Sequence, residues 1–190
     1  MIELFEEDEK KSDFDFSWYN NSNPSFILSN GYTVEFNNAY TFAHRAWITT
    51  TNSIESANME GKLTRIAMAK MLSNYAINIL GKKPANKVVP NFPDVSKKMN
   101  DDYGWAVDLA YQLWIMWVWI DNFRPNDAVT RWEFATALSR MLYETVDWTP
   151  YYSTHLTKLS KEWIITNSDP KINELRWYVM IMLMRSAKDW

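Results

Sequence analysis

The chain repeats one pattern three times, and this repeat limits its fold more than any other feature. Three tryptophans, Trp47, Trp114 and Trp163, are each followed by an isoleucine and preceded by apolar residues four, seven and eleven positions earlier. These spacings place side chains on one face of an α-helix. The pattern therefore predicts three short helices, each ending just before its tryptophan. In chain order, the apolar positions are Phe36, Tyr40 and Ala43, then Tyr103, Val107 and Ala110, then Tyr152, Leu156 and Leu159.

A second helix is predicted in each copy, beyond a loop. It begins at an arginine, which is Arg65, Arg131 or Arg176, and apolar residues follow three and seven positions later. An isolated pair of helices cannot bury its apolar face, so the copies are expected to share one core. The chain is therefore interpreted as three helix–loop–helix units.

The boundaries of the units follow from the breaks between these patterns. We expect residues 1–35, rich in Asn, Ser and Asp, to be an N-terminal arm or the end of a preceding region. The first unit and its linker occupy 36–87, the second 88–143 and the third 144–190, with helical parts near 36–80, 88–143 and 151–187. The stretch "GKKPANKVVPNFPDV" between the first two units carries helix-breaking glycine and prolines.

Composition excludes several classes of site and partner. The chain has no cysteine and only two histidines, His44 and His155, so we expect no disulfide, metal site or cofactor. A net charge of −3 argues against a nucleic-acid partner. No apolar run is long enough for a transmembrane segment. The start, "MIELFEEDEKK", does not resemble a signal peptide. Either the protein is cytoplasmic, or the chain is a fragment whose export signal lies elsewhere.

The three anchor tryptophans fall at a position where tryptophan is unfavourable. Just past a helix end the chain often turns left-handed, and glycine is preferred there. A bulky residue at this position costs about 1–2 kcal/mol. The chain has 11 tryptophans and 4 glycines, whereas average usage of about 7% would give about 13 glycines. The excess of tryptophan is therefore about as large as the deficit of glycine.

The second unit resembles the S-layer homology domain family. That family's repeat reads approximately F-x-D-V, a helix with Ala-Val, G-I-x-x-G, a loop with F-x-P, and T-R-x-E-F opening a second helix. The matching stretches here are "NFPDV" at 91–95, "AV" at 106–107, "WIMW" at 114–117, "NFRPN" at 122–126 and "TRWEFATALSRML" at 130–142. The resemblance covers about residues 36–187. It is weaker in units one and three, where Ala67 replaces the motif's glutamate and Leu175 its threonine.

Tryptophan stands where the family has glycine, and we hypothesise that the source organism reads the codon UGA as glycine. The strongest candidates are Trp47, Trp114, Trp117, Trp119, Trp148 and Trp163. Trp132 and Trp177 follow repeat arginines, where a small residue is usual. Trp105 is left open, and Trp18 and Trp190 have no context. The alternative is that the tryptophans are genuine and serve as core residues or as platforms for stacking sugars.

The resemblance implies both a fold and a function. The implied fold is mainly α, with three helix–loop–helix repeats packed in a pseudo-threefold prism that has grooves between units. The implied function is non-covalent anchoring of a cell-surface protein to cell-wall polysaccharide or peptidoglycan, without catalysis. The chain would then lie at the cell surface, and self-assembly could proceed through parts of a longer protein.

The T-R-x-E motif supplies most of the candidate binding residues. Thr130 and Glu133 fit a capping box at a helix start. Arg131, in the first turn, could bind an anion through charge-assisted hydrogen bonds, or it could form an ion pair with a neighbouring unit. Arg65 and Arg176 repeat this position. Asp94 of "NFPDV" belongs to the family motif, although it could instead cap a helix.

Two other classes of function have weaker support. Asp101 and Asp102 are adjacent carboxylates, whereas a glycosidase needs two groups on opposite sides of the scissile bond. The stretch at 130–142 could pass for the recognition helix of a helix-turn-helix protein, but the net negative charge argues against that. An aromatic-rich carbohydrate-binding or glycan-processing module stays as the alternative to anchoring.

Overall fold

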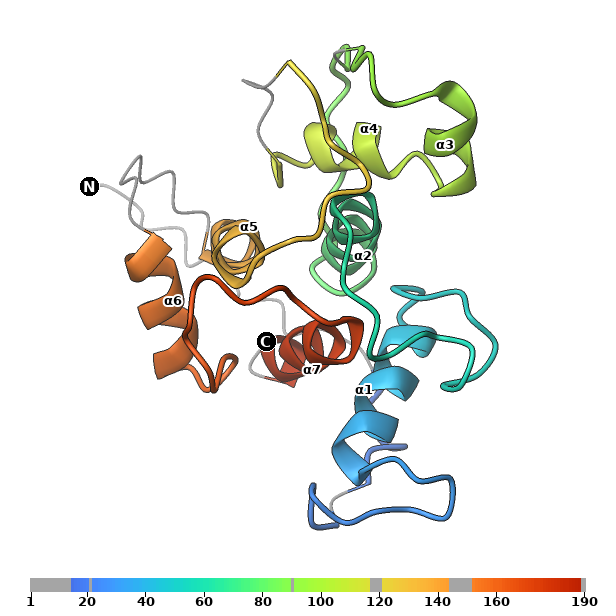
Figure 1. Cartoon of the computed structure of the whole chain (residues 1–190), viewed down its shortest axis with the longest axis vertical. Helices are drawn as coiled ribbons and strands as arrows, with labels where there is room; N and C mark the ends of the chain where they lie inside the picture. Colours follow the sequence, from blue (N-terminus) through green and yellow to red (C-terminus); the bar gives the residue numbers. More distant parts are fainter. Residues whose placement is uncertain (1–14, 21, 90, 117–120, 144–151, 189–190) are drawn as a thin grey trace, which may run out of the picture.

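The computed structural model describes residues 15–20, 22–89, 91–116, 121–143 and 152–188 (Figure 1). The described residues form seven helices and no extended strand, only isolated bridges. The prediction of a mainly α fold is confirmed. The helices are α1 (Val34–Arg45), α2 (Arg65–Asn78), α3 (Lys97–Asp102), α4 (Ala106–Gln112), α5 (Arg131–Tyr143), α6 (Tyr152–Lys161) and α7 (Arg176–Lys188).

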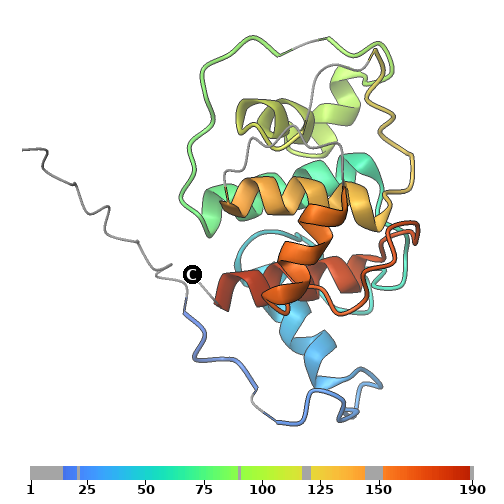
Figure 2. The same ribbon diagram turned by 90° about the vertical axis from the view of Figure 1, so that its left-hand side faces the viewer.

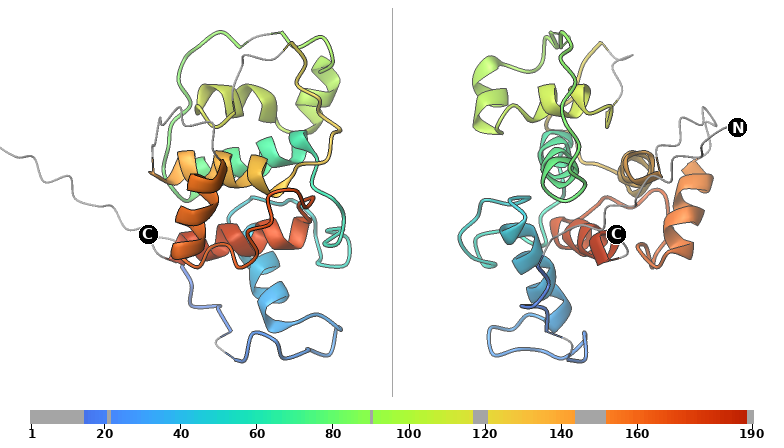
Figure 3. Two further views of the ribbon diagram at one scale, coloured as in Figure 1. Left: turned by 60° about the vertical axis from the view of Figure 1, so that its left-hand side comes forward. Right: turned by 180° about the vertical axis from the view of Figure 1, so that it is seen from behind.

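The first and second helices of the units occupy different parts of the molecule. The second helices α2, α5 and α7 each begin at the predicted arginine and lie together in the middle (Figures 1 and 2). The first helices lie around them, with α1 and α4 at opposite ends in both views of Figure 3. Each first helix packs on the second helix of a different unit: α1 on α7, α4 on α2, and α6 on α5. The units are therefore interleaved.

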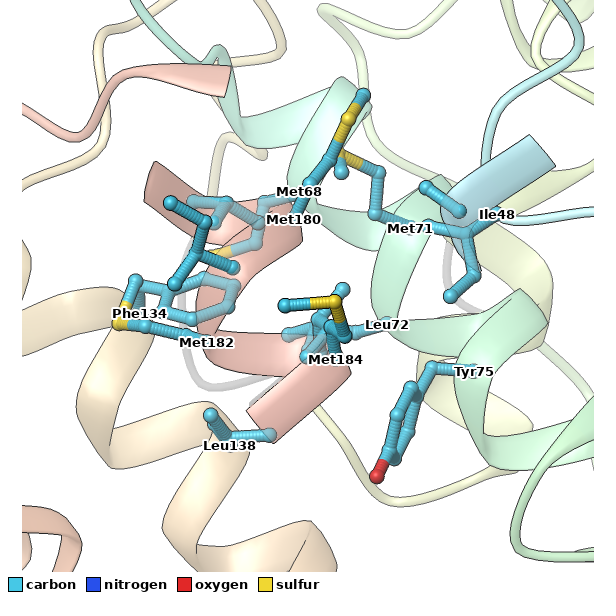
Figure 4. Close-up of a cluster of buried hydrophobic side chains, with 14 of the residues drawn as sticks. Ile48, Met68, Met71, Leu72, Tyr75, Phe134, Leu138, Met180, Met182 and Met184 are labelled. Atoms are coloured by element: carbon cyan, nitrogen blue, oxygen red, sulfur yellow. The ribbon is translucent and has the colours of Figure 1, made fainter. Parts of the chain in front are cut away.

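The second helices supply the centre of the core. Their apolar residues three and seven positions after the arginine are at most 2% exposed, and burial of such a side chain stabilises by about 1.5–3 kcal/mol. These residues are Met68, Leu72, Phe134, Leu138, Val179 and Leu183. Methionines of α2 and α7 fill the space between the second helices (Figure 4). Their flexible side chains suit an irregular interior.

A closed ring of backbone hydrogen bonds joins the three units. Its members stand two residues before each repeat arginine: Leu63, Val129 and Glu174. The amide of Leu63 donates to Glu174, that of Val129 to Leu63, and that of Glu174 to Val129, each at 2.8 Å. Each unit is thus linked to the other two by the same bond.

The backbone amide of each repeat arginine adds a second bond between units, which runs in the opposite direction around the ring. Arg65 donates to a carbonyl in the loop of unit two, Arg131 to one in unit three, and Arg176 to one in unit one. The acceptors are the carbonyls of Asp127, Ile172 and Gly61, at 3.0, 2.8 and 3.0 Å. The start of every second helix is therefore fixed on the loop of the next unit.

The first helices end as the tryptophan spacing predicts. Trp47, Trp114 and Trp163 have φ values of 58°, 59° and 55°, in the left-handed region. In the first unit the amide of Trp47 donates to His44 at 3.1 Å and that of Ile48 to Ala43 at 2.8 Å. The other two ends repeat both bonds. This is a Schellman motif with tryptophan at the position where glycine is favoured.

A fourth helix end has the same geometry but carries glycine. After α3, Gly104 has φ 68° and donates to Asp101 at 2.9 Å, while Trp105 donates to Asn100 at 2.8 Å. The predicted helix through Tyr103 is therefore wrong, because Tyr103 is the C-cap of α3 and α4 begins only at Ala106. Trp105 follows with φ 56°, so two consecutive left-handed residues break the helix here.

The described part of the N-terminal arm packs against α1. The ring of Phe16 stacks on Phe42, with centroids 6.0 Å apart. Asn38 of α1 exchanges two hydrogen bonds with the backbone of Asn20. Residues 1–14, with Trp117, Trp119, Trp148 and Trp190, lie outside the described residues. Within the described ranges, no helix is both long and apolar enough to cross a membrane.

Candidate functional site

The predicted binding residues lie where one unit meets the next. Each repeat arginine stands in the first turn of a second helix, against the loop of the following unit. We name these places the 1–2 junction, with Arg65; the 2–3 junction, with Arg131; and the 3–1 junction, with Arg176. The backbone is alike at all three, so the differences lie in the side chains.

At the 1–2 junction the arginine is buried and paired. Arg65 is 8% exposed. Its Nε donates to the carbonyl of Phe123 at 2.8 Å, and its Nη1 lies 3.3 Å from Oε1 of Glu133. Burial lowers the pKa of Arg65, and the charge of Glu133 opposes that shift. The guanidinium therefore has a carboxylate partner on the next unit.

Glu133 also supplies the glutamate side of the predicted capping box. Its Oε2 accepts hydrogen bonds from the backbone amide of Thr130 at 2.9 Å and from the hydroxyl at 2.7 Å. A third contact comes from Arg124, whose Nη2 lies 3.9 Å from Oε1. One carboxylate thus caps α5 and faces two guanidinium groups.

Asp94 holds the loop of unit two in place. It accepts hydrogen bonds from the backbone amides of Phe123 at 2.9 Å and Arg124 at 2.6 Å. Burial raises the pKa of Asp94, whereas these hydrogen bonds lower it by more, so the net shift of the pKa is downward. The alternative that Asp94 caps a helix is wrong, because Ser96 caps α3. Arg124 is left-handed, with φ 58°, and Asp94 holds this conformation.

The 2–3 junction contains a buried ion pair. Arg131 is 3% exposed and Glu174 is 0% exposed. Both Nε and Nη2 of Arg131 donate to the carboxylate of Glu174, and Nη1 donates to the carbonyl of Asn167. Burial raises the pKa of Glu174, while Arg131 opposes the shift. Arg131 therefore forms an ion pair with the neighbouring unit, which is one of the two roles that the sequence left open for it.

At the 3–1 junction, the two positions that carry a glutamate at the other junctions are apolar. Ala67 stands where unit two has Glu133, and Leu63 stands where unit three has Glu174. Arg176 is half-buried, and its Nε is buried without a hydrogen-bond partner in the part of the chain that the structure describes. No ion pair to Arg176 is found among those residues either. This arginine differs from its two equivalents in having no ion-pair partner among the described residues.

The structure brings the six predicted residues together only in part. Asp94, Thr130, Glu133 and Arg65 gather at the 1–2 junction, while Arg131 and Arg176 occupy the other two. Sequence reasoning missed Glu174 as a partner of Arg131. The signal for it is a glutamate two residues before the repeat arginine, where the other units have Leu63 and Val129.

The other chemical motifs have structural partners. Asp101 and Asp102 form exposed ion pairs with Lys97 at 2.6 Å and Lys98 at 2.7 Å. His155 is buried, with Nδ1 3.1 Å from the hydroxyl of Ser139. No group of three His, Cys, Asp or Glu among the described residues could hold a metal ion.

No family model matches the chain, and no curated protein matches it. The functional argument therefore rests on the junctions and on the helix ends.

Proposed function

We propose that the chain is an S-layer homology module that anchors a cell-surface protein non-covalently to cell-wall polysaccharide or peptidoglycan. In this proposal the three units form a pseudo-threefold prism, and the wall polymer binds at the junctions between them. The observation that carries the proposal is the repetition of one junction three times, each with an arginine in the same place.

The ring of hydrogen bonds supports the prism. Three equivalent residues each donate to the next and accept from the previous one, which is the pattern expected of units related by rotation about a common axis. The exchange of first helices between units supports the same arrangement. A chain built in this way offers repeated sites to a repeating polymer, and linked binding events raise the overall affinity.

Binding without catalysis is favoured by the state of the carboxylates. Glu133 and Glu174 are engaged by arginines, and Asp94 is held by backbone amides. Hydrolysis of a glycan would need a pair of carboxyl groups free to act on opposite sides of the bond. These three are committed to structural contacts.

One observation favours the alternative of an aromatic carbohydrate-binding surface. Trp47, Trp114 and Trp163 are 67%, 73% and 78% exposed, and exposed aromatic rings can stack on sugars. Their left-handed backbone has a different explanation, however. We infer that glycine belongs at these three positions and, by the same geometry, at Trp105. Trp132 and Trp177 lie inside α5 and α7 without a positive φ, so the backbone makes no such demand there.

Glycine at these positions also accounts for the absence of a family match. The family's G-I-x-x-G motif falls on Trp114–Trp117, and its first glycine repeats at Trp47 and Trp163. Tryptophan there removes residues that define the motif. We expect the chain with glycine restored to match the S-layer homology model.

Co-sedimentation with purified cell walls tests the proposal. The chain and a variant with Trp47, Trp114 and Trp163 changed to glycine are each mixed with walls that keep their polysaccharide, and with walls stripped of it. We expect both proteins to pellet with intact walls. A folded glycine variant that stays in the supernatant with both wall preparations would contradict anchoring. Loss of pelleting in the glycine variant alone would favour stacking by the tryptophans.

A further inference from the structure

We propose that His155 makes the packing of α6 on α5 sensitive to pH, so that acidification releases α6 from the rest of the molecule. Among the described residues of the three first helices, His155 is the one buried side chain that can ionise. The switch goes beyond wall anchoring and does not depend on it, because it lies in a helix interface and not at a junction between units.

A comparison of equivalent positions in the three units singles out this histidine. His155 stands eight residues before its anchor tryptophan, where the other units have Ala39 and Ala106. Its partner Ser139 stands eight residues after the repeat arginine of α5, where α2 has Ser73. The equivalent positions therefore carry alanine and serine in the α4–α2 interface, but histidine and serine in the α6–α5 interface. Histidine is thus not required to build this kind of packing.

The surroundings of His155 suit a neutral imidazole. His155 is 4% exposed and Ser139 is 1% exposed, and Nδ1 of the ring lies 3.1 Å from the serine hydroxyl. A hydroxyl can donate to a neutral ring or accept from it, so the bond forms with either tautomer. It cannot balance the positive charge that the ring gains on protonation, and burial of an unbalanced charge is unfavourable.

The charged groups nearest to this pair along the two helices are cations. Arg140 follows Ser139 in α5, and burial lowers the pKa of Arg140. Lys158 lies one turn after His155 in α6, and its Nζ is 3.6 Å from the ring centroid of Tyr143 in α5. Positive neighbours oppose a further positive charge, so they add to the cost of protonating the buried ring.

Helix α6 has less support than the other first helices among the described residues. It packs on α5 and lies at the edge of the molecule (Figure 1). Helix α4 packs on α3 as well as on α2, and the N-terminal arm packs on α1 through Phe16 and Asn20. The buried apolar side chains of α6 are Leu156 and Leu159. Burial of an ion costs free energy of the same order as two such side chains contribute, so protonation opposes the packing of α6 directly.

The sign of the pH dependence follows from proton binding. The open form exposes His155, which then takes up a proton near pH 6.5, as a free imidazole does, whereas the packed form resists the proton. The open form therefore binds more protons below about pH 6.5, and acidification favours it. Between about pH 7.5 and about pH 5.5, the equilibrium constant for opening should rise about tenfold.

Hydrogen exchange of the unchanged full chain at about pH 7.5 and about pH 5.5 tests the switch, after correction for the intrinsic pH dependence of exchange. We expect the amides of α6 to lose about tenfold in protection at the lower pH. The amides of α1 and α4 are the internal controls, and we expect their protection to stay the same.

Three variants assign the effect to its side chain. His155→Ala reproduces the alanine and serine of the α4–α2 interface, and His155→Asn keeps a polar group beside Ser139 that does not titrate. We expect α6 in both variants to keep the same protection at the two pH values. His44→Gln removes the other histidine of the chain, which is exposed, and should leave the response of α6 unchanged. If neither His155 variant folds at pH 7.5, the His44→Gln result decides between the two histidines.

The proposal is overturned if α6 keeps its protection at the lower pH, or if α1 and α4 lose as much. A response that survives in a folded His155→Ala or His155→Asn variant, or that disappears in His44→Gln, also overturns it. Glu144 and Asp147 lie outside the described residues. A gain of protection in α6 on acidification would show a carboxylate beside the protonated ring, and this opposite sign would contradict the switch.

Discussion

Two kinds of helix end in this molecule share one backbone geometry. Two residues past the last helical residue, α3 has Gly104, with φ 68°, whereas α1, α4 and α6 have tryptophans, with φ 58°, 59° and 55°. All four ends make the same two hydrogen bonds. The backbone therefore requires a left-handed residue at all four helix ends. Only the end of α3 has glycine, the residue that adopts this conformation without strain.

The side chains of the three tryptophans do little to offset this strain. They are 67–78% exposed, so they bury little apolar surface. Trp114 has one cation–π contact, in which Nζ of Lys87 lies 2.9 Å from the ring centroid. Trp177 offers a contrast, because it lies within α7 and packs on Phe36 with centroids 4.5 Å apart. Tryptophan is supported by packing at Trp177 and not at the helix ends.

The largest effect is expected when all three helix ends receive glycine. Trp47→Gly, Trp114→Gly and Trp163→Gly together should raise the free energy of unfolding by about 3–6 kcal/mol, since each relieves about 1–2 kcal/mol of left-handed strain and distant sites add. Urea denaturation measures the change. An unchanged or lower free energy of unfolding would contradict the inference that the three tryptophans strain the helix ends.

The same substitution should have the opposite sign inside a helix. Trp177→Gly removes a ring that packs on Phe36 and places glycine in α7, so we expect the free energy of unfolding to fall by about 2–4 kcal/mol. Thermal unfolding followed by circular dichroism checks this. A gain in stability from Trp177→Gly would mean that replacing any tryptophan stabilises the protein. The effect could then not be attributed to left-handed strain at the helix ends.

The reverse change at the glycine end should cost what the other ends already bear. Gly104→Trp should lower the free energy of unfolding by about 1–2 kcal/mol, because an added Cβ at Gly104 meets no neighbouring atom within 4 Å and only the backbone conformation opposes it. Chemical denaturation of this single variant is the measurement. A neutral result would show that tryptophan is tolerated at these ends without strain.

The smallest effect is expected at Trp105. Trp105→Gly should relieve about 1–2 kcal/mol of left-handed strain, but it also loses the bond from the indole Nε1 to Asp101 at 2.5 Å. The net gain should therefore stay below that of a single helix-end variant. The denaturation midpoints of Trp105→Gly and Trp47→Gly show which variant gains more stability. A loss of stability in Trp105→Gly would contradict the inference that glycine belongs at Trp105.

Much of the fold could be predicted from the sequence, because local patterns carry it. The spacing before Trp47, Trp114 and Trp163 fixes where the first helices end, and the repeat arginines mark the start of the second. The break after Tyr103 was missed because the apolar spacing continues through it. Gly104, one of only 4 glycines in the chain, was the signal for that break.

The contacts of the candidate site could not be predicted in the same way. Arg131 and Glu174 are 43 residues apart, and Asp94 reaches amides 29 and 30 residues away. Such pairs depend on which unit packs beside which, and the repeat pattern does not contain that order. The motif singled out the arginines from the sequence, but their partners come from the three-dimensional arrangement.

Reading the codons at Trp47, Trp105, Trp114 and Trp163 in the gene is the most direct test of the central claim, that glycine belongs at these left-handed positions. We predict UGA at all four, and UGG at Trp177, where a packed ring has a structural role. UGG at the four left-handed positions would contradict the claim. The exposed tryptophans would then be a genuine feature of the protein, and stacking on sugars would replace the arginine junction as the leading mode of binding.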